Sequence, residues 1–265
     1  MPEKINIMGV RLNNIDIDET VDFILKSLSQ NKRGYICTPN PEMLLESENN
    51  PTFSKVLNKS LLNIPDGIGV LWAATNIANN HSKLKAIVTL PLILINPAKF
   101  KHVLKARVTG TDLLPYICKK LENTHYSIFL LGAKEGIAKQ AAKNLKNKYP
   151  NLIIKGTFAG SPNTKDKIRI INLINSKKPD ILFVAYGAPK QEMWIAENLK
   201  RLSTVKIAIG VGGAFDFISK NKRRAPKWMQ KIGIEWLFRL INEPTRIKRI
   251  FNATVRFPYR FIKTL

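Results

Sequence analysis

Short apolar runs alternate with polar stretches of helical length between residues 127 and 213. The runs are SIFLLG, LIIKGTF, DILFVAYG and KIAIGVG, and the stretches between them cover residues 134–149, 164–177 and 189–202. The runs predict strands, and the apolar spacing of three or four within the stretches predicts helices. Connections of this length join parallel strands and place helices on both faces of the sheet. The pattern predicts a doubly wound, Rossmann-like α/β fold, in which ligands bind at the carboxyl ends of the strands.

The alternation extends to the first third of the chain. INIMGV and GYICTP read as strands around a helix over about residues 19–30, for which Asp18 is the expected N-cap. Asp16 and Asp18 form an Asp-x-Asp pair of the kind that can hold a metal on a nucleotide diphosphate, but their place before a helix favours capping. A further strand, LLNI, leads to Pro65, Asp66 and a helix that begins near residue 67. Asp66 is therefore expected in a strand-to-helix turn, at the end of the sheet where sites form.

Two segments depart from this alternation. Residues 78–106 pack apolar side chains densely between basic ones, which predicts an insertion that is either an extra core helix pair or an amphipathic element touching a membrane. Residues 220–265 carry 13 Lys or Arg against two Glu. Apolar residues over 228–241 predict one helical stripe, and a second helix is expected after Pro244. The chain is thus divided into an α/β core, residues 1–219, and a basic, amphipathic helical appendage, residues 220–265, that is expected to lie on an anionic membrane.

Composition narrows the class of partner. With 45% hydrophobic and 23% charged residues, the 265-residue chain can bury a core, which excludes a disordered or coiled-coil protein. A net charge of +24 calls for an anionic partner: nucleic acid, an anionic membrane or a phosphorylated substrate. Two Cys and three scattered His give neither a disulfide framework nor metal-ligand spacing, so a reducing cytoplasm and no metal are expected. The N-terminus resembles no export signal, and no apolar run reaches the ~18 residues of a spanning helix.

Several standard motifs are missing. The sequence holds no Walker phosphate loop, nucleophile elbow or zinc-protease helix, and GVGGAF has Phe215 where a dinucleotide fingerprint has its last glycine. What remains is a set of polar clusters after predicted strands: TPNP over 38–41, PDG over 65–67, RVTGTD over 107–112, LGA over 131–133 and YGAPKQE over 186–192. Each alone is an ordinary turn. Their common place on one side of a parallel sheet predicts a single site there.

Nine sequence blocks occur in an order that resembles the WecG/TagA/CpsF family of bacterial glycosyltransferases. They are TPNPEML, IPDGIGV, RVTGTDL, LLGA, PDILFVAYGAPKQEMWI, GVGGAFDF, RAPKW, GIEWLFRL and EPTRI, and the similarity runs from about Ile5 to Arg249. The resemblance implies transfer of a sugar, typically N-acetylmannosamine, from a UDP donor to N-acetylglucosamine on a polyprenyl diphosphate. It also implies inversion, no obligatory metal, no other cofactor, and a role in teichoic acid or related cell-surface polysaccharide synthesis. The insertion at 78–106 departs from the family's pattern.

The resemblance also implies roles for individual residues. Asp66 matches the family's catalytic base, with helix capping as the alternative. Thr38 and Asn40 match site residues that would orient sugar hydroxyls, Gln191 is the other polar match, and Lys190 would reach a phosphate. Arg107, Thr109 and Asp112 are assigned to donor or acceptor binding, with a surface position as the alternative for Arg107. Gly132 and Gly212 would allow a nucleotide close to backbone N–H groups, unless they serve tight turns alone. Arg224, Arg239 and Arg246 of the appendage, which is expected to fold over the site at the membrane, would bind the diphosphates, unless they are solvated helix charges.

Other functions stay open at this point. The basic composition and the aromatic residues among the Lys and Arg of residues 220–265 also fit a nucleic-acid-binding protein, although no recognised motif supports it. A membrane-associated nucleotide-sugar binder without catalysis, and a transferase of another hexose such as glucose, are further alternatives. The complete set of blocks around Asp66 favours the enzyme. We therefore expect a transferase that is cytoplasmic and peripherally attached to the inner face of the membrane, with homo-oligomerisation possible.

Overall fold

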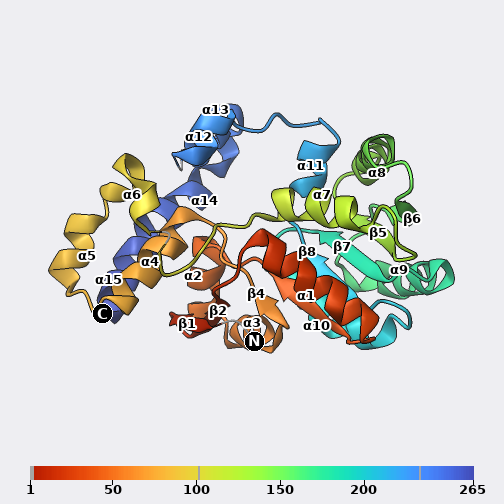
Figure 1. Ribbon diagram of the computed structural model, residues 1–265, viewed down its shortest axis with the longest axis horizontal. Coiled ribbons are helices and arrows are strands. Elements are labelled where there is room, and N and C mark those ends of the chain that lie inside the picture. Colours follow the sequence, from red (N-terminus) through yellow and green to blue (C-terminus); the bar gives the residue numbers. More distant parts are fainter. Residues whose placement is uncertain (1–2, 101, 233) are drawn as a thin grey trace.

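A six-stranded parallel sheet forms the centre of the computed structural model, which describes residues 3–100, 102–232 and 234–265 (Figure 1). The strands lie in the order β4 (Leu62–Asn63), β3 (Gly34–Cys37), β8 (Ile207–Gly210), β7 (Ile181–Ala185), β5 (Ser127–Gly132) and β6 (Ile153–Phe158). The chain builds β3 and β4 first; in the other half it begins at β5, adds β6 at the edge and then moves inward through β7 to β8, which pairs with β3. The predicted doubly wound α/β fold is confirmed.

Helices cover both faces of the sheet. One face packs against α1 (Ile17–Ser29), α7 (Gly110–Leu121), α8 (Ile137–Lys148) and α11 (Ala214–Ile218). The other packs against α2 (Pro41–Asn49), α3 (Pro51–Lys59), α4 (Ile68–Ala78), α9 (Thr164–Lys177) and α10 (Lys190–Asn198), which continues into η2 (Leu199–Arg201). The middle strands β5, β7 and β8 are buried along their whole length, which is why they read as continuous apolar runs.

Two expectations for the N-terminal region are wrong. INIMGV is not one strand of the main sheet, because β1 (Lys4–Ile7) and β2 (Val10–Asn13) form a separate antiparallel hairpin. Ile7 pairs directly with Val10, so the two residues between them make a tight turn. The N-cap of α1 is Asp16 and not Asp18: Asp16 Oδ1 accepts from Glu19 N at 2.9 Å, while Glu19 Oε2 accepts from Asp16 N at 3.1 Å. This reciprocal capping box needs its carboxylate three residues before Glu19, which only Asp16 provides.

The segment 78–106 forms two short helices and a turn of 3-10 helix beside α4: α5 (Lys83–Thr89), α6 (Leu92–Ile95) and η1 (Pro97–Phe100). Its inner side is tied to α4, since Trp72 Nε1 donates to Thr89 Oγ1 at 3.1 Å and both side chains are buried. Phe100 is buried against the same face. The outer side of α5 and α6, by contrast, exposes large apolar side chains to solvent.

Residues 220–265 fold as a chain of short helices rather than two long ones. They are α12 (Lys227–Lys231), α13 (Glu235–Asn242), η3 (Pro244–Arg246), α14 (Ile247–Phe251), a π-helical turn (Asn252–Arg256) and α15 (Phe257–Thr264). The predicted single stripe over 228–241 is therefore wrong. Ile234 N donates back to Met229 O at 3.0 Å, a bond across five residues that terminates a helix instead of extending it.

The appendage returns to the core at its far end. Phe257 and Phe261 of α15 are buried, and the Phe261 ring meets the Trp72 ring edge-on with centroids 5.1 Å apart. Two ion pairs fasten the same region to α2, Arg249 with Glu42 and Arg260 with Glu48. As a result α13 and α14 line one pocket together with the loops that follow β3 and β4.

Candidate active site

A pocket of about 290 Å³ opens where the carboxyl ends of β3, β4, β7 and β8 face α13 and α14. Nine of the residues selected from the sequence line it: Thr38, Asn40, Asp66, Arg107, Thr109, Gln191, Gly212, Arg239 and Arg246. Four others do not: Asp112, Gly132, Lys190 and Arg224. The convergence of separate sequence blocks follows from the parallel sheet, because every strand ends at the same edge.

Asp66 lies in the turn between β4 and α4. Its backbone N–H donates to Pro39 O at 3.0 Å, which fixes the turn against the loop after β3. The alternative that Asp66 caps α4 does not hold, because the helix starts at Ile68, its N-cap is Gly67 and no side chain caps it. Burial raises the pKa of the Asp66 carboxyl to about 6, opposed by Arg107 and Arg239 and reinforced by Glu235 and Asp112. A carboxylate with this pKa is ionised at pH 7 and still basic enough to take a proton.

Thr38 and Asn40 extend from the end of β3 into the same pocket. The Thr38 side chain is buried. Asn40 caps α2, with Oδ1 accepting from Met43 N at 3.0 Å. Among the described residues the Asn40 amide nitrogen has no hydrogen-bond partner, so this half of the side chain is left for a ligand.

Gln191 lines the pocket, but its amide is committed to the protein. Its Oε1 accepts from Gly187 N and from Gly212 N, each at 3.0 Å, and Nε2 donates to Glu192 Oε1 at 2.7 Å. The side chain thereby joins the loop after β7 to the loop after β8. Gly210 makes room for it, since a Cβ there would lie 2.6 Å from Gln191 Nε2. Gln191 therefore shapes two walls of the pocket.

Glu192 was not singled out as a functional residue by the sequence. It lies behind Gln191, 1% exposed, and burial raises the pKa of its carboxyl to about 7. Its second oxygen, Oε2, has no hydrogen-bond partner among the described residues. The sequence does contain a signal that could have identified Glu192 as a buried carboxylate. It lies three positions before the buried Ile195 and so shares the inner face of α10.

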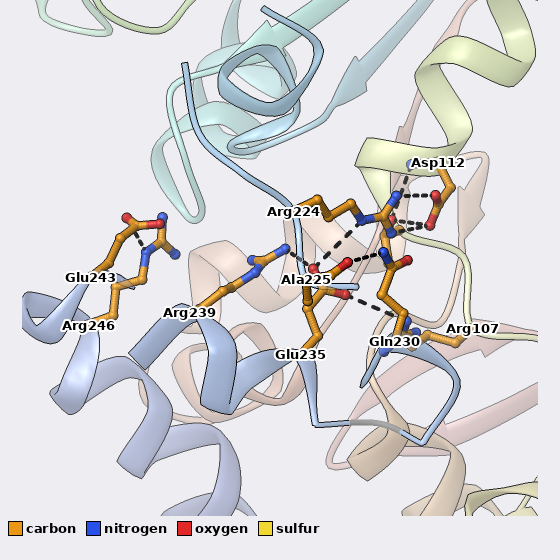
Figure 2. A network of polar contacts seen from close by, with 10 residues as sticks. Arg107, Asp112, Arg224, Ala225, Gln230, Glu235, Arg239, Glu243 and Arg246 are labelled. Atoms are coloured by element: carbon orange, nitrogen blue, oxygen red, sulfur yellow. Dashed lines mark hydrogen bonds and ion pairs between the residues drawn. The ribbon is translucent and has the colours of Figure 1, made fainter. Parts of the chain in front are cut away.

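A network of arginines and carboxylates bridges the core and the appendage (Figure 2). Glu235 of α13, 6% exposed, accepts from Arg239 Nη2 at 2.6 Å and lies 3.7 Å from Arg107 Nη2 and 3.8 Å from Arg224 Nε. Glu235 was not predicted as a site residue, since an acidic residue in the first turn of a helix is ordinary. The position of Arg107 and Arg239 in the pocket is therefore fixed by a buried carboxylate.

Asp112 and Arg224 form a second part of the network (Figure 2), and neither lines the pocket. Arg224 holds Asp112 through both carboxylate oxygens, with Nη2 at 2.7 Å from Oδ2. Burial acts to raise the pKa of Asp112, yet the Arg224 guanidinium holds it below its ordinary value. Thr109 Oγ1 donates to the same carboxylate at 2.7 Å and caps α7. This pair fastens the start of the appendage to α7.

The remaining predicted residues are placed as follows. Arg246 Nε contacts Glu243 Oε2 at 2.8 Å while lining the pocket. Gly132 has φ +106°, and a Cβ there would come within 2.8 Å of the Ala185 carbonyl, so the tight turn alone requires glycine. Lys190 is exposed at the start of α10. Within the described ranges, no three side chains of His, Cys, Asp or Glu lie together as a metal site.

A parallel α/β sheet with a polar, arginine-lined pocket at its strand ends is an arrangement suited to phosphorylated ligands. The chain belongs to the glycosyl transferase WecG/TagA/CpsF family, whose model matches residues 5–89 and 91–265. The resemblance inferred from the nine blocks is confirmed, and the match extends through most of the segment 78–106.

Relatives of known name include the N-acetylglucosaminyldiphosphoundecaprenol N-acetyl-beta-D-mannosaminyltransferases of two bacteria. The Bacillus subtilis (strain 168) protein is 31% identical over 240 residues, which cover 90% of this chain and 84% of the relative. The Staphylococcus aureus (strain MRSA252) protein is 27% identical over 265 residues, covering 98% of this chain and 92% of the relative.

Proposed function

We propose that this protein is an inverting, metal-independent glycosyltransferase. It moves N-acetylmannosamine, or a related sugar, from a UDP-sugar to N-acetylglucosaminyl-diphospho-polyprenol in the synthesis of teichoic acid or another cell-surface polysaccharide. The observation that carries the proposal is Asp66, a carboxylate with a pKa of about 6 in a pocket that Arg107, Arg239 and Arg246 also line. The names of the relatives support the donor sugar and the acceptor.

The chemistry needs one base and a cationic wall. Asp66 takes the proton of the acceptor hydroxyl while that oxygen attacks the anomeric carbon from the side opposite UDP. The bond between the anomeric carbon and the diphosphate oxygen breaks, and UDP leaves with the electron pair. Arg239 and Arg246 stabilise the developing charge on the diphosphate, because guanidinium groups match phosphate oxygens. A single displacement inverts the anomeric centre and requires no second carboxylate.

The place of action is the inner face of the cell membrane, where a polyprenyl acceptor would be held. No helix in the described part of the chain is long and apolar enough to cross a bilayer. Residues 220–265 expose Ile247 and Phe251 next to Lys248, a mixture suited to the headgroup region of an anionic leaflet. The appendage thus both closes the pocket and attaches the enzyme to the surface that holds its acceptor.

The test is transfer from a panel of UDP-sugars, including UDP-N-acetylmannosamine and UDP-glucose, to a short-chain lipid diphosphate N-acetylglucosamine in EDTA. Asp66→Asn should lower kcat by about 10²- to 10⁴-fold without lowering the melting temperature. Asp22→Asn, at an exposed carboxylate of α1, is the matched control and should retain full activity. Full activity of Asp66→Asn would remove the base from the proposal. Absence of turnover with any donor, together with tight oligonucleotide binding, would favour the nucleic-acid alternative.

A further inference from the structure

The outer face of α5 and α6 is apolar where a surface helix is normally polar. Leu84, Val88 and Ile95 are 72%, 65% and 76% exposed. Ile87 and Leu94 are exposed on the same two helices, whereas Ala86 and Thr89 are the buried positions of α5. Five large apolar side chains exposed within 12 residues form a patch of the kind that marks an interaction site. We call these five residues the hairpin face.

The charge around the hairpin face has one sign. The sequence contains no Asp or Glu from residue 67 to residue 111, and Lys83, Lys85 and Lys99 are exposed next to the apolar residues. α15 packs beside α5 (Figure 1), and the sequence has no acidic residue after Glu243. The surroundings of the face are therefore cationic on both elements.

This combination fits an anionic lipid surface better than a second copy of the chain. In a twofold dimer the same patch meets itself, so the lysines of one copy would face the lysines of the other. A leaflet with anionic headgroups instead offers opposite charge around the rim and hydrocarbon under the centre. Lys side chains can lie along the apolar surface and keep their ammonium groups in the headgroup layer.

We propose that the hairpin face inserts into an anionic leaflet as a second contact, in addition to the appendage. The proposal rests on the function proposed above, since it places the enzyme at its lipid acceptor. α4 connects the two sites: it begins next to Asp66, is buried over most of its 11 residues, and leads into α5. A helix of this length spans ~16 Å. Insertion of the hairpin face therefore fixes how far Asp66 stands from the membrane.

Site-specific labelling tests the insertion directly. Both native cysteines, Cys37 and Cys118, are buried, so a new surface cysteine can be labelled selectively with an environment-sensitive fluorophore. In the full chain, Leu84→Cys and Ile95→Cys labels should shift to the blue and brighten at least twofold with phosphatidylglycerol vesicles. A label at Ile168→Cys, an apolar position of α9 that is 63% exposed, is the matched control and should not respond. Equal responses at all three positions, or none at 84 and 95, would overturn the insertion.

Substitution separates membrane attachment from catalysis. The variant Leu84→Asn/Ile87→Asn/Ile95→Asn should partition into the same vesicles at least tenfold less than Ile168→Asn. Its turnover of a short-chain, water-soluble acceptor should equal that of the wild type, because none of the three residues lines the pocket. Unchanged partitioning, or a loss of dimers measured by light scattering without a loss of vesicle binding, would refute the proposal. Failure of the wild type to turn over any acceptor would instead contradict the proposed function. The vesicle measurement would still test the insertion, because partitioning does not depend on turnover.

Discussion

Asp66, the proposed base, has the properties that a general base needs, and its environment predicts an activity that depends on pH. Its carboxyl is raised from an ordinary pKa of 3.8 to about 6 by burial. As the pH is lowered, Asp66 therefore takes up the proton that would prevent it from acting as a base at a pH about two units higher than a surface aspartate does. We expect kcat/KM of the wild type to be constant near pH 7.5 and to fall tenfold per pH unit below about pH 6. A rate profile with no decline down to pH 5 would contradict the assignment.

We expect Glu235 to act as a positioning residue for Arg107 and Arg239 and to influence the pKa of Asp66 through its charge. Its carboxylate raises the pKa of Asp66, while Arg107 and Arg239 lower it. Glu235→Gln removes a negative neighbour, so the acidic limb of the rate profile should move to lower pH, on the order of 0.5 pH unit. Arg239→Met removes a positive neighbour and should move the limb upward. A loss of activity without any shift in either variant would assign Glu235 a purely structural role.

At the scale of single elements, the sequence predicts a regular strand or helix better than it predicts which residue caps or interrupts a helix. β5 and α9 match their predicted bounds because a buried parallel strand is a continuous apolar run and α9 has a clear helical period. The N-cap of α1 could not be chosen between Asp16 and Asp18 by pattern, since it depends on the reciprocal bond with Glu19. The break between α12 and α13 was missed because apolar spacing continues across it.

The candidate site shows the same division. Strand-end motifs predicted most of the pocket, because the parallel sheet gathers them. The division of labour among them could not be predicted: Gln191 is committed to two loops, and Arg224 to Asp112. The Gln191–Gly212 bond and the Arg224–Asp112 pair join residues 21 and 112 positions apart, and no local sequence pattern records them.

Glu192, in the first turn of α10, should make the free energy of unfolding depend on pH. In the folded chain Glu192 has a pKa of about 7, against an ordinary value of 4.5, so the folded state holds its proton when the unfolded chain has lost it. Stability therefore falls as pH rises from about 4.5 to 7, by up to about 3 kcal/mol. Glu192→Gln keeps the neutral form, and its free energy of unfolding relative to the wild type should increase between pH 5 and pH 8 in urea titrations. Glu197→Gln, at an exposed carboxylate of the same helix, should show no such trend.

At the scale of the whole molecule, the charge of +24 governs attachment. Salt shortens the Debye length from ~10 Å at 0.1 M to ~3 Å at 1 M, which screens exposed lysines and leaves apolar insertion intact. We expect partitioning into phosphatidylglycerol vesicles to fall at least tenfold over this range and then to level off. Vesicles of phosphatidylcholine should bind at that residual level at either salt concentration. Binding to anionic vesicles that is equal at both salt concentrations would contradict an electrostatic role.

The docking of Phe261 on Trp72 joins residues 189 positions apart in the sequence. During synthesis, α4 and the hairpin emerge early, whereas α13, α14 and the helix that holds them emerge last. A nascent chain therefore presents an uncovered tryptophan and a pocket without Arg239 and Arg246. Completion of the pocket is thus a late step that needs a long-range contact, and a chain that stops before α15 would lack the Phe261–Trp72 contact that docks the end of the appendage on α4.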